Sequence, residues 1–301
     1  MIASTLIDFL CGKIIFNSTP EKAQRKIGLL ISIAANLSIL GFFKYGNFFA
    51  ENVSILARSI GLGEIVLPEF FNKIILPIGI SFYTFQSMSY TIDIYRKKAL
   101  PAENFLTFAC YVSMFPQLVA GPIVRYSDIA KQLKNRIHSA GSFIYGFTRF
   151  NYGFAKKILL ANPVGEIADL CFSAGQSSLS TTAAWIGVIC YAFQIYFDFS
   201  AYSDMAIGLG KMFGFTFREN FDSPYKSGSI TEFWRRWHIS LSSFLKDYLY
   251  IPLGGNRKGT SRTYVNLIIV MFLGGLWPVS YTHLRAHETR HDLVCRLLLE
   301  K

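Results

Sequence analysis

The stretch SITEFWRRWHISLSSFLKDYLYIPLGGNRKGTSR, from Ser229 to Arg262, decides the fold. It opens with Ser229-Ile-Thr-Glu232, the spacing of a capping box, in which two side chains satisfy backbone N–H groups at the start of a helix. Large apolar residues then recur every three or four positions, as they do on one face of an amphipathic helix. The sequence therefore predicts a single helix over 229–251, ended by a tight turn at Pro252 and Gly254-Gly-Asn256.

The composition around this stretch is that of a membrane protein. The chain has 301 residues, of which 51% are hydrophobic and 16% are aromatic. Charged residues make up 16% of the chain, whereas a soluble domain has about 25%. Several apolar stretches approach the ~20 residues that a helix needs to cross a bilayer. We therefore predict an all-α, polytopic membrane protein.

The apolar stretches alternate with short basic clusters. The expected spans are 27–49, 74–95, 105–124, 143–170 and 185–215, with 1–16 as part of another and 264–277 as a last apolar run that is too short to span. Gly121 and two prolines interrupt the apolar pattern of 105–124, which predicts a broken or re-entrant helix there. Such non-helical backbone at membrane depth must be buried in protein or line a cavity.

The basic residues predict how the spans are oriented. Residues 94–136 hold seven Lys and Arg, residues 214–262 hold eight, and residues 171–184 hold none. Because cytoplasmic loops are enriched in Lys and Arg, the first two segments are expected inside and the third outside. This arrangement predicts a multi-pass protein of a bacterial inner (plasma) membrane. The net charge of +11 is spread over these clusters, so we expect lipid and not nucleic acid as its partner.

His238 is the first candidate for chemistry. On the predicted helix it shares a face with large apolar side chains, which would hold the imidazole neutral, as suits a general base or an oriented hydrogen-bond partner. The alternative is a histidine that packs in the interior and bonds a backbone carbonyl. Its neighbour Trp237 is expected to line the same polar region or to support it. No metal-binding spacing accompanies these residues.

A second candidate lies within the apolar span 185–215. Gln194, Asp198 and Tyr202 are four residues apart and share one face of the predicted helix, and Ser200 and Asp204 form a neighbouring pair. Ionisable groups at membrane depth are costly and usually face a cavity or a partner. They predict either the polar lining of a tunnel or a hydrogen-bond network that fixes the packing of the helices.

The third candidate is Arg125, which follows the Gly121-Pro122 break. A guanidinium there could pair with an anionic group such as a phosphate or a carboxylate. The alternative is an interfacial arginine whose side chain reaches out to lipid phosphate.

These stretches resemble the membrane-bound O-acyltransferase family, and above all its branch of alginate O-acetylation subunits. The segments that carry the resemblance are PIGISFYTFQSMSYTIDIYR (77–96), FPQLVAGPIVRY (115–126), YFDFSAYSDMAIGLGKMFGF (196–215) and ENFDSPYKSGSITEFWRRWHISLSSFLKDYLYIPLGGNRKG (219–259). The resemblance implies a bundle of helices with a central tunnel and the transfer of an acyl group to a hydroxyl.

The family has two functional histidines. The resemblance places the supporting one, in RRWHISL, at His238. The main catalytic histidine is expected directly after Gly274-Gly-Leu-Trp277, where this chain has Pro278. The chain as written is therefore expected to be inactive.

The sequence changes character after Trp277. The tail 278–301 holds three of the five histidines and no membrane pattern, which is typical of translated adapter or vector sequence. We expect 1–277 to be a partial membrane domain, incomplete at both ends, and 278–301 to be non-native. Two weaker alternatives are a native terminus and a metal-binding face formed by the histidines of the tail, His283, His287 and His291.

The function implied for the intact parent is O-acetyl transfer. An acyl donor in the cytoplasm, with acetyl-CoA as the candidate, would supply acetyl groups for an exported polysaccharide such as alginate. A periplasmic or extracellular acetyltransferase partner would complete the transfer, and no bound cofactor or metal is expected. The alternatives are a D-alanyl transferase of the teichoic acid type and a transporter or scaffold without chemistry.

Overall fold

The structure is a computed structural model, which describes residues 1–19, 22–61, 77, 79–118, 121–173 and 180–282. These residues form helices and loops without a strand, which confirms the all-α prediction. The elements are α1 (Ile2–Asn17), α2 (Ala23–Ser59), α4 (Ile80–Tyr95), α5 (Phe105–Val112), α6 (Phe115–Leu118), α7 (Tyr126–Lys134), α8 (Ala140–Lys156), η1 (Lys157–Ala161), α9 (Asn162–Ser173), α10 (Thr181–Met212), η2 (Pro224–Lys226), α11 (Ile230–Arg236), α12 (Ile239–Leu245), η3 (Lys246–Tyr250) and α13 (Thr260–Thr282). The chain forms two compact units, 1–36 with 78–243 and 37–77 with 244–301.

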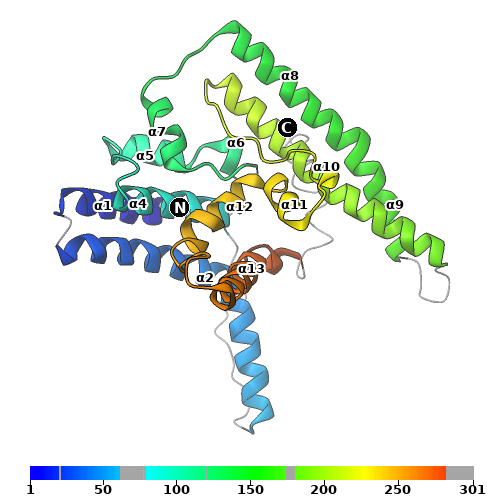
Figure 1. Ribbon diagram of the computed structural model, residues 1–301, viewed down its shortest axis with the longest axis horizontal. Helices are drawn as coiled ribbons and strands as arrows, with labels where there is room; N and C mark the ends of the chain where they lie inside the picture. Colours follow the sequence, from blue (N-terminus) through cyan, green and yellow to red (C-terminus); the bar gives the residue numbers. More distant parts are fainter. Residues whose placement is uncertain (20–21, 62–76, 78, 119–120, 174–179, 283–301) are drawn as a thin grey trace. The chain divides into compact units, whose positions relative to one another are not determined.

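The first unit is organised around α8 and α10, which run side by side (Figure 1). Small residues allow their backbones to approach closely. A Cβ atom at Gly146 would lie 2.6 Å from the carbonyl oxygen of Gly208, and one at Gly153 would lie 2.6 Å from the carbonyl oxygen of Ala201. The glycines therefore permit the close, van der Waals packing that associates helices in lipid.

Aromatic side chains pack α4, α5 and α7 together at another place in this unit. The ring of Tyr90 lies 4.1 Å from that of Phe108 and 4.8 Å from that of Tyr126, measured between centroids. The hydroxyl of Tyr111 donates to the carbonyl oxygen of Val124 at 2.9 Å. These rings bury large apolar areas, and the hydroxyl finds a partner as buried tyrosines usually do.

The predicted break in 105–124 is confirmed. α5 ends at Val112, α6 adds one short turn to Leu118, and the described residues 121–125 that follow are not helical, with a φ of 108° at Gly121. A Cβ atom at Gly121 would lie 2.9 Å from the Cβ of Ala206 on α10. Residues 121–124 are buried, so this irregular backbone lies inside the protein, as backbone at membrane depth requires.

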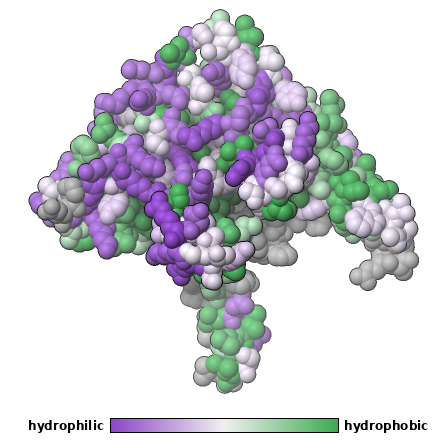
Figure 2. Space-filling model, viewed as in Figure 1, coloured by the Kyte–Doolittle hydropathy of each residue, from purple (hydrophilic) through white to green (hydrophobic). Residues whose placement is uncertain are grey.

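Two described helices are long and apolar enough to cross a membrane. They are the Ala23–Gly46 part of α2 and the whole of α10, which match the expected spans 27–49 and 185–215. The expected span 74–95 is only partly described, as the 16 residues of α4. Large apolar side chains on the outer surface of α9 and the start of α10 are exposed (Figure 2), and this is the surface that lipid would cover.

In the second unit, the predicted turn after 251 is confirmed. Gly254 and Gly255 both have positive φ, at 111° and 56°. The buried Asn266 of α13 donates from its side chain to the carbonyl oxygen of Gly255 at 2.8 Å. α13 continues beyond Trp277 and reaches Thr282. The proposed boundary between 277 and 278 stays a prediction, and most of the tail lies outside the described residues.

Candidate functional site

His238 lies in a break between two helices. The predicted helix start at Ser229 is confirmed, because its hydroxyl accepts from the backbone N–H of Glu232 at 3.1 Å at the start of α11, although the return bond of the Glu232 side chain is not to Ser229 itself. The Glu232 carboxylate accepts from the N–H of Gly228. α11 ends at Arg236, His238 has a φ of 42°, and α12 begins directly after it. The prediction of one continuous helix over 229–251 is therefore wrong.

A loop that inserts into the helical hydrogen-bond ladder explains the break. In a continuous helix the N–H of Ser240 would bond to the carbonyl oxygen of Arg236. The Arg236 oxygen instead accepts from the N–H of Asp222 at 3.0 Å. The N–H groups of Ile239 and Ser240 donate to the main-chain and side-chain oxygens of Asn220, at 2.9 and 3.2 Å. The break is thus held by the 219–223 loop, which precedes α11 in the sequence.

Asn220 is the centre of this junction. It is fully buried, and its Nδ2 donates to the hydroxyl of Ser203 on α10 at 3.0 Å. Its Oδ1 lies 2.8 Å from the hydroxyl of Ser240 and 3.0 Å from Nδ1 of His238. The Ser240 hydroxyl also accepts from the N–H of Ile123 at 2.9 Å, which ties the junction to the broken segment 105–124.

The imidazole of His238 lies among aromatic rings. Its centroid is 4.7 Å from that of Phe199, edge to face, and 6.4 Å from that of Phe221. Desolvation by this burial lowers the pKa of His238 to about 3, so the ring is neutral at pH 7. The expectation of a neutral imidazole is confirmed. The aromatic rings around His238 come from α10 and the 219–223 loop. The hydrogen-bond partner of its Nδ1 is the side chain of Asn220 and not a backbone carbonyl.

Trp237 packs in a cluster of aromatic rings beside the junction. Its ring centroid lies 5.2 Å from that of Phe221 and 5.5 Å from that of Phe233. Tyr196 of α10 and Tyr225 of η2 complete the cluster, each 6.2 Å away. The cluster joins α10, α11 and the loop between them, and so holds the loop against the helix break.

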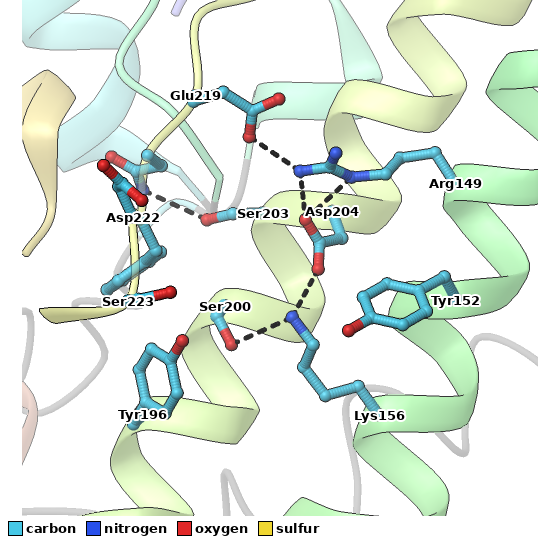
Figure 3. Close-up of a pocket in the computed structure, with 12 residues that line it drawn as sticks. Arg149, Tyr152, Lys156, Tyr196, Ser200, Ser203, Asp204, Glu219, Asp222 and Ser223 are labelled. Atoms are coloured by element: carbon cyan, nitrogen blue, oxygen red, sulfur yellow. Dashed lines mark hydrogen bonds and ion pairs between the residues drawn. The ribbon is translucent and has the colours of Figure 1, made fainter. Parts of the chain in front are cut away.

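A cavity of about 180 Å³ opens next to Asn220, between α8, α10 and the 219–223 loop. It is lined by Arg149, Tyr152, Lys156, Tyr196, Ser200, Ser203, Asp204, Glu219, Asn220, Phe221, Asp222 and Ser223 (Figure 3). Hydroxyl, carboxylate and cationic groups make up most of this lining. The cavity can therefore accept a small polar group through many hydrogen bonds.

Ion pairs cross this cavity from α8 to α10. Nη2 of Arg149 lies 2.7 Å from Oδ1 of Asp204, and Nζ of Lys156 lies 2.5 Å from Oδ2 (Figure 3). Arg149 also reaches Glu219 at 2.6 Å, and Lys156 reaches the hydroxyl of Ser200 at 3.4 Å. Asp204 is thus shared by two cations, which compensates a carboxylate that is only 9% exposed.

The polar residues predicted on α10 lie in different surroundings in the structure. Ser200 and Asp204 line the cavity. Asp198 instead pairs with Lys157 of η1 at 2.7 Å, and Gln194 lies against Gly165 of α9. Tyr202 is half-buried and does not line the cavity. The face predicted from the four-residue spacing is therefore separate from the face that carries the cavity.

Arg125 is buried at the start of α7, with 9% of its surface exposed. It interacts electrostatically with Asp128, which also bonds to Arg218 at 2.6 Å. The pairing of Arg125 with a phosphate or carboxylate group stays a prediction. Within the described ranges, no group of three or more histidine, cysteine, aspartate or glutamate residues could hold a metal, and the three histidines of the tail lie outside those ranges.

Sequence reasoning missed Arg149, Lys156 and Asn220. Arg149 and Lys156 could have been found from the sequence, because they are charged residues within the apolar stretch 143–170. They are seven positions apart and therefore lie on the same face of a helix. Asn220 left none, since a single polar residue in a loop carries no periodicity.

Comparisons with known proteins show which family the sequence matches. A sequence model of the membrane-bound O-acyltransferase family (MBOAT) matches residues 29–277. The chain is 52% identical over 257 residues to a protein of Pseudomonas putida named probable alginate O-acetylase AlgI, covering 85% of this chain and 51% of that protein.

Two less similar relatives are also named as transferases. The chain is 39% identical over 307 aligned positions to a peptidoglycan O-acetyltransferase of Helicobacter pylori, covering 90% of this chain and 56% of the relative. It is 29% identical to a teichoic acid D-alanyltransferase of Streptococcus thermophilus, covering 66% of this chain and 51% of the relative. The chain spans about half of the length of these relatives. It belongs to the membrane-bound O-acyltransferase family.

Proposed function

We propose that the parent of this chain is a membrane O-acyltransferase that passes acetyl groups toward an exported polysaccharide. The observation that carries the proposal is the neutral His238, held by Asn220 beside a polar cavity in a chain of this family. Two of its relatives are named O-acetylase and O-acetyltransferase, which favours acetyl as the group transferred. A thioester such as acetyl-CoA on the cytoplasmic side is the donor that we propose.

The chemistry assigns separate roles to the residues. The oxygen of the acceptor hydroxyl bonds to the acyl carbon while its proton passes to an imidazole nitrogen. The acyl C–S bond of the donor breaks, and the thiolate that leaves takes up this proton and becomes a thiol. The main catalytic histidine would follow Trp277, where this chain has Pro278. His238 supports the reaction from the junction. Ser200 and Asp204 belong to the polar shell, and Asp198 contributes an outer ion pair to it.

The setting of the parent follows from the same reasoning. We place it as a multi-pass protein in the inner membrane of a bacterium, with basic loops in the cytoplasm. A periplasmic or extracellular acetyltransferase would then carry the acetyl group to the polymer, for which alginate is the candidate. The chain of 301 residues by itself is expected to be inactive.

A chimera tests this proposal. Residues 278–301 are replaced by the corresponding C-terminal part of the Pseudomonas putida relative, and membrane vesicles that contain the chimera are supplied with labelled acetyl-CoA. We expect label to enter acceptor hydroxyls with the chimera and not with the 301-residue chain. In the chimera, His238→Ala should lower the rate about 100-fold. His138→Ala is the matched control, since His138 lines a separate hollow with Lys211 and Met212.

Three other outcomes would change the proposal. Acetyl transfer by the 301-residue chain above its His238→Ala background would contradict its inactivity. Transfer of D-alanine alone would move the parent to the reaction named for the Streptococcus thermophilus relative. A chimera that inserts and folds but labels no acceptor would favour a transporter or scaffold.

A further inference from the structure

The orientation of the Asn220 amide is fixed by its surroundings. The backbone N–H of Ser240 can only donate, and it points to the side chain of Asn220 at 3.2 Å. The atom that it meets must therefore be the amide oxygen. The other end of the amide, Nδ2, donates to the hydroxyl of Ser203, which is consistent with this orientation. If the amide were flipped, its Nδ2 would face the backbone N–H of Ser240, and two donors would meet without an acceptor.

The amide orientation decides the tautomer of His238. Nδ1 of His238 lies 3.0 Å from the amide oxygen of Asn220. Because an oxygen of this kind only accepts, Nδ1 must carry the hydrogen. In a neutral imidazole the other nitrogen, Nε2, then holds the lone pair. None of the described residues forms a hydrogen bond with Nε2, so among these residues its lone pair has no partner.

The geometry points to a new role for Asn220. We propose that Asn220 is a positioning residue that holds His238 as the Nδ1–H tautomer, so that Nε2 accepts a hydrogen bond from the substrate that receives the acyl group. The identity of that substrate rests on the proposed function, whereas the tautomer rests on the hydrogen bonds alone.

Asn220 is well held for this task. Both of its oxygens accept hydrogen bonds from the first residues of α12, and its Nδ2 is anchored on α10. Its side chain is fully buried. The amide can therefore fix the ring orientation of His238 without carrying a charge that would favour the imidazolium form.

Nitrogen NMR of the 301-residue chain tests the tautomer directly. The chain is labelled with ¹⁵N-histidine and placed in lipid nanodiscs at pH 7, and the signals of His238 are identified by their loss in His238→Gln. We expect a protonated Nδ1 and an unprotonated Nε2. An Nε2–H signal with an unprotonated Nδ1 in the unmodified chain would overturn the proposal, even if no Asn220 variant folds.

Two substitutions of Asn220 separate positioning from simple packing. Asn220→Leu has a similar size and no acceptor, so His238 should move toward the Nε2–H form that neutral histidine favours in water. Asn220→Asp keeps an acceptor for Nδ1–H and should restore the Nδ1–H form. Asn266→Leu, at a buried asparagine of α13 in the other unit, should leave the His238 signals unchanged. A His238 tautomer that is equal in all three variants would contradict the proposal.

The same substitutions in the chimera test the second half of the proposal. Asn220→Leu should lower kcat about 10- to 100-fold with little change in KM for the donor, and Asn220→Asp should recover part of kcat. An unchanged kcat in Asn220→Leu would refute the role of Nε2 in the reaction. An inactive chimera that still shows the Nδ1–H form would refute the proposed function and leave the positioning role of Asn220 intact.

Discussion

The His238 junction and the ion pairs between α8 and α10 are both polar and largely buried, yet their polar groups are satisfied in different ways. In the ion-pair cluster, the carboxylate of Asp204 is matched on both of its oxygens by Arg149 and Lys156. At the junction, His238 is matched on Nδ1 and has no described partner on Nε2. The cluster is complete without a substrate, whereas the junction leaves one acceptor open.

This difference separates structure from chemistry. Charges that compensate one another in low dielectric mainly fix how helices pack, and removal of one partner is strongly destabilising because it leaves an uncompensated buried charge. A neutral group with one oriented nitrogen and one open nitrogen can act on a substrate. Substitutions in the cluster should therefore change stability most, and substitutions at the junction should change the state of His238 most.

The largest loss of stability is expected from Asp204→Ala. The substitution leaves Arg149 and Lys156 without their shared carboxylate, and Lys156 is only 13% exposed. Removing one partner of a buried ion pair costs about 3–5 kcal/mol. The free energy of unfolding, measured by thermal or denaturant unfolding in detergent, should fall by about this amount.

Asp198→Ala is the matched control on the same helix. The Asp198 side chain is 41% exposed, and Lys157 is its only ion-pair partner among the described residues. An exposed pair contributes about 0–1 kcal/mol, so this variant should stay close to the parent chain. Equal losses for Asp198→Ala and Asp204→Ala would mean that Asp204 is not the centre of the packing between α8 and α10.

A smaller loss is expected from Gly153→Ala. Its new methyl group would lie 2.6 Å from the carbonyl oxygen of Ala201, so α8 and α10 must move apart. Overpacking of this kind costs about 1–3 kcal/mol. Gly141→Ala, in the first turn of α8, has nothing within 4 Å of its Cβ position. The same thermal assay should show it equal to or more stable than the parent, because alanine favours helix over glycine.

At the junction, the backbone of His238 should respond to glycine. A φ of 42° is in the left-handed region, where a side chain costs about 1–2 kcal/mol and glycine costs little. His238→Gly should therefore be more stable than His238→Ala by about 1 kcal/mol in thermal unfolding. The reverse order would indicate that the helix closes across the break once the imidazole is gone.

The sequence predicted the elements of the fold better than their interruptions. Spans within α2 and α10 follow from apolar length, and the break in 105–124 follows from Gly121 and its prolines. The break at His238 could not be predicted, because the stretch 229–251 has helical periodicity throughout. It arises from Asn220, which takes the hydrogen bonds of α12, and such a tertiary contact leaves no local pattern.

The candidate site shows the same limit. The neutral state of His238 could be predicted from the apolar residues of 229–251. The rings that surround it in the structure, however, belong to α10 and the 219–223 loop. The spacing of Gln194, Asp198 and Tyr202 indicated a shared face but not which face meets α8. The face of α10 that meets α8 depends on Gly146 and Gly153, because these glycines set where the two helices touch. As a result Asp204, and not Asp198, lies in the cavity.

The smallest effect is expected from the caps that begin the helices of the two regions. The hydroxyls of Ser229 and Ser180 both accept from a backbone N–H three residues later, at 3.1 and 3.2 Å. Loss of such a cap costs about 1 kcal/mol.

α11 has 7 residues and α10 has 32, so Ser229→Ala removes a larger share of the interactions that stabilise its helix. We expect Ser229→Ala to unfold at a lower temperature than Ser180→Ala and to broaden the ¹⁵N signals of His238, because α11 leads directly into the junction. If Ser180→Ala broadens those signals as much, the order at His238 depends on α10 as a whole and not on the local junction.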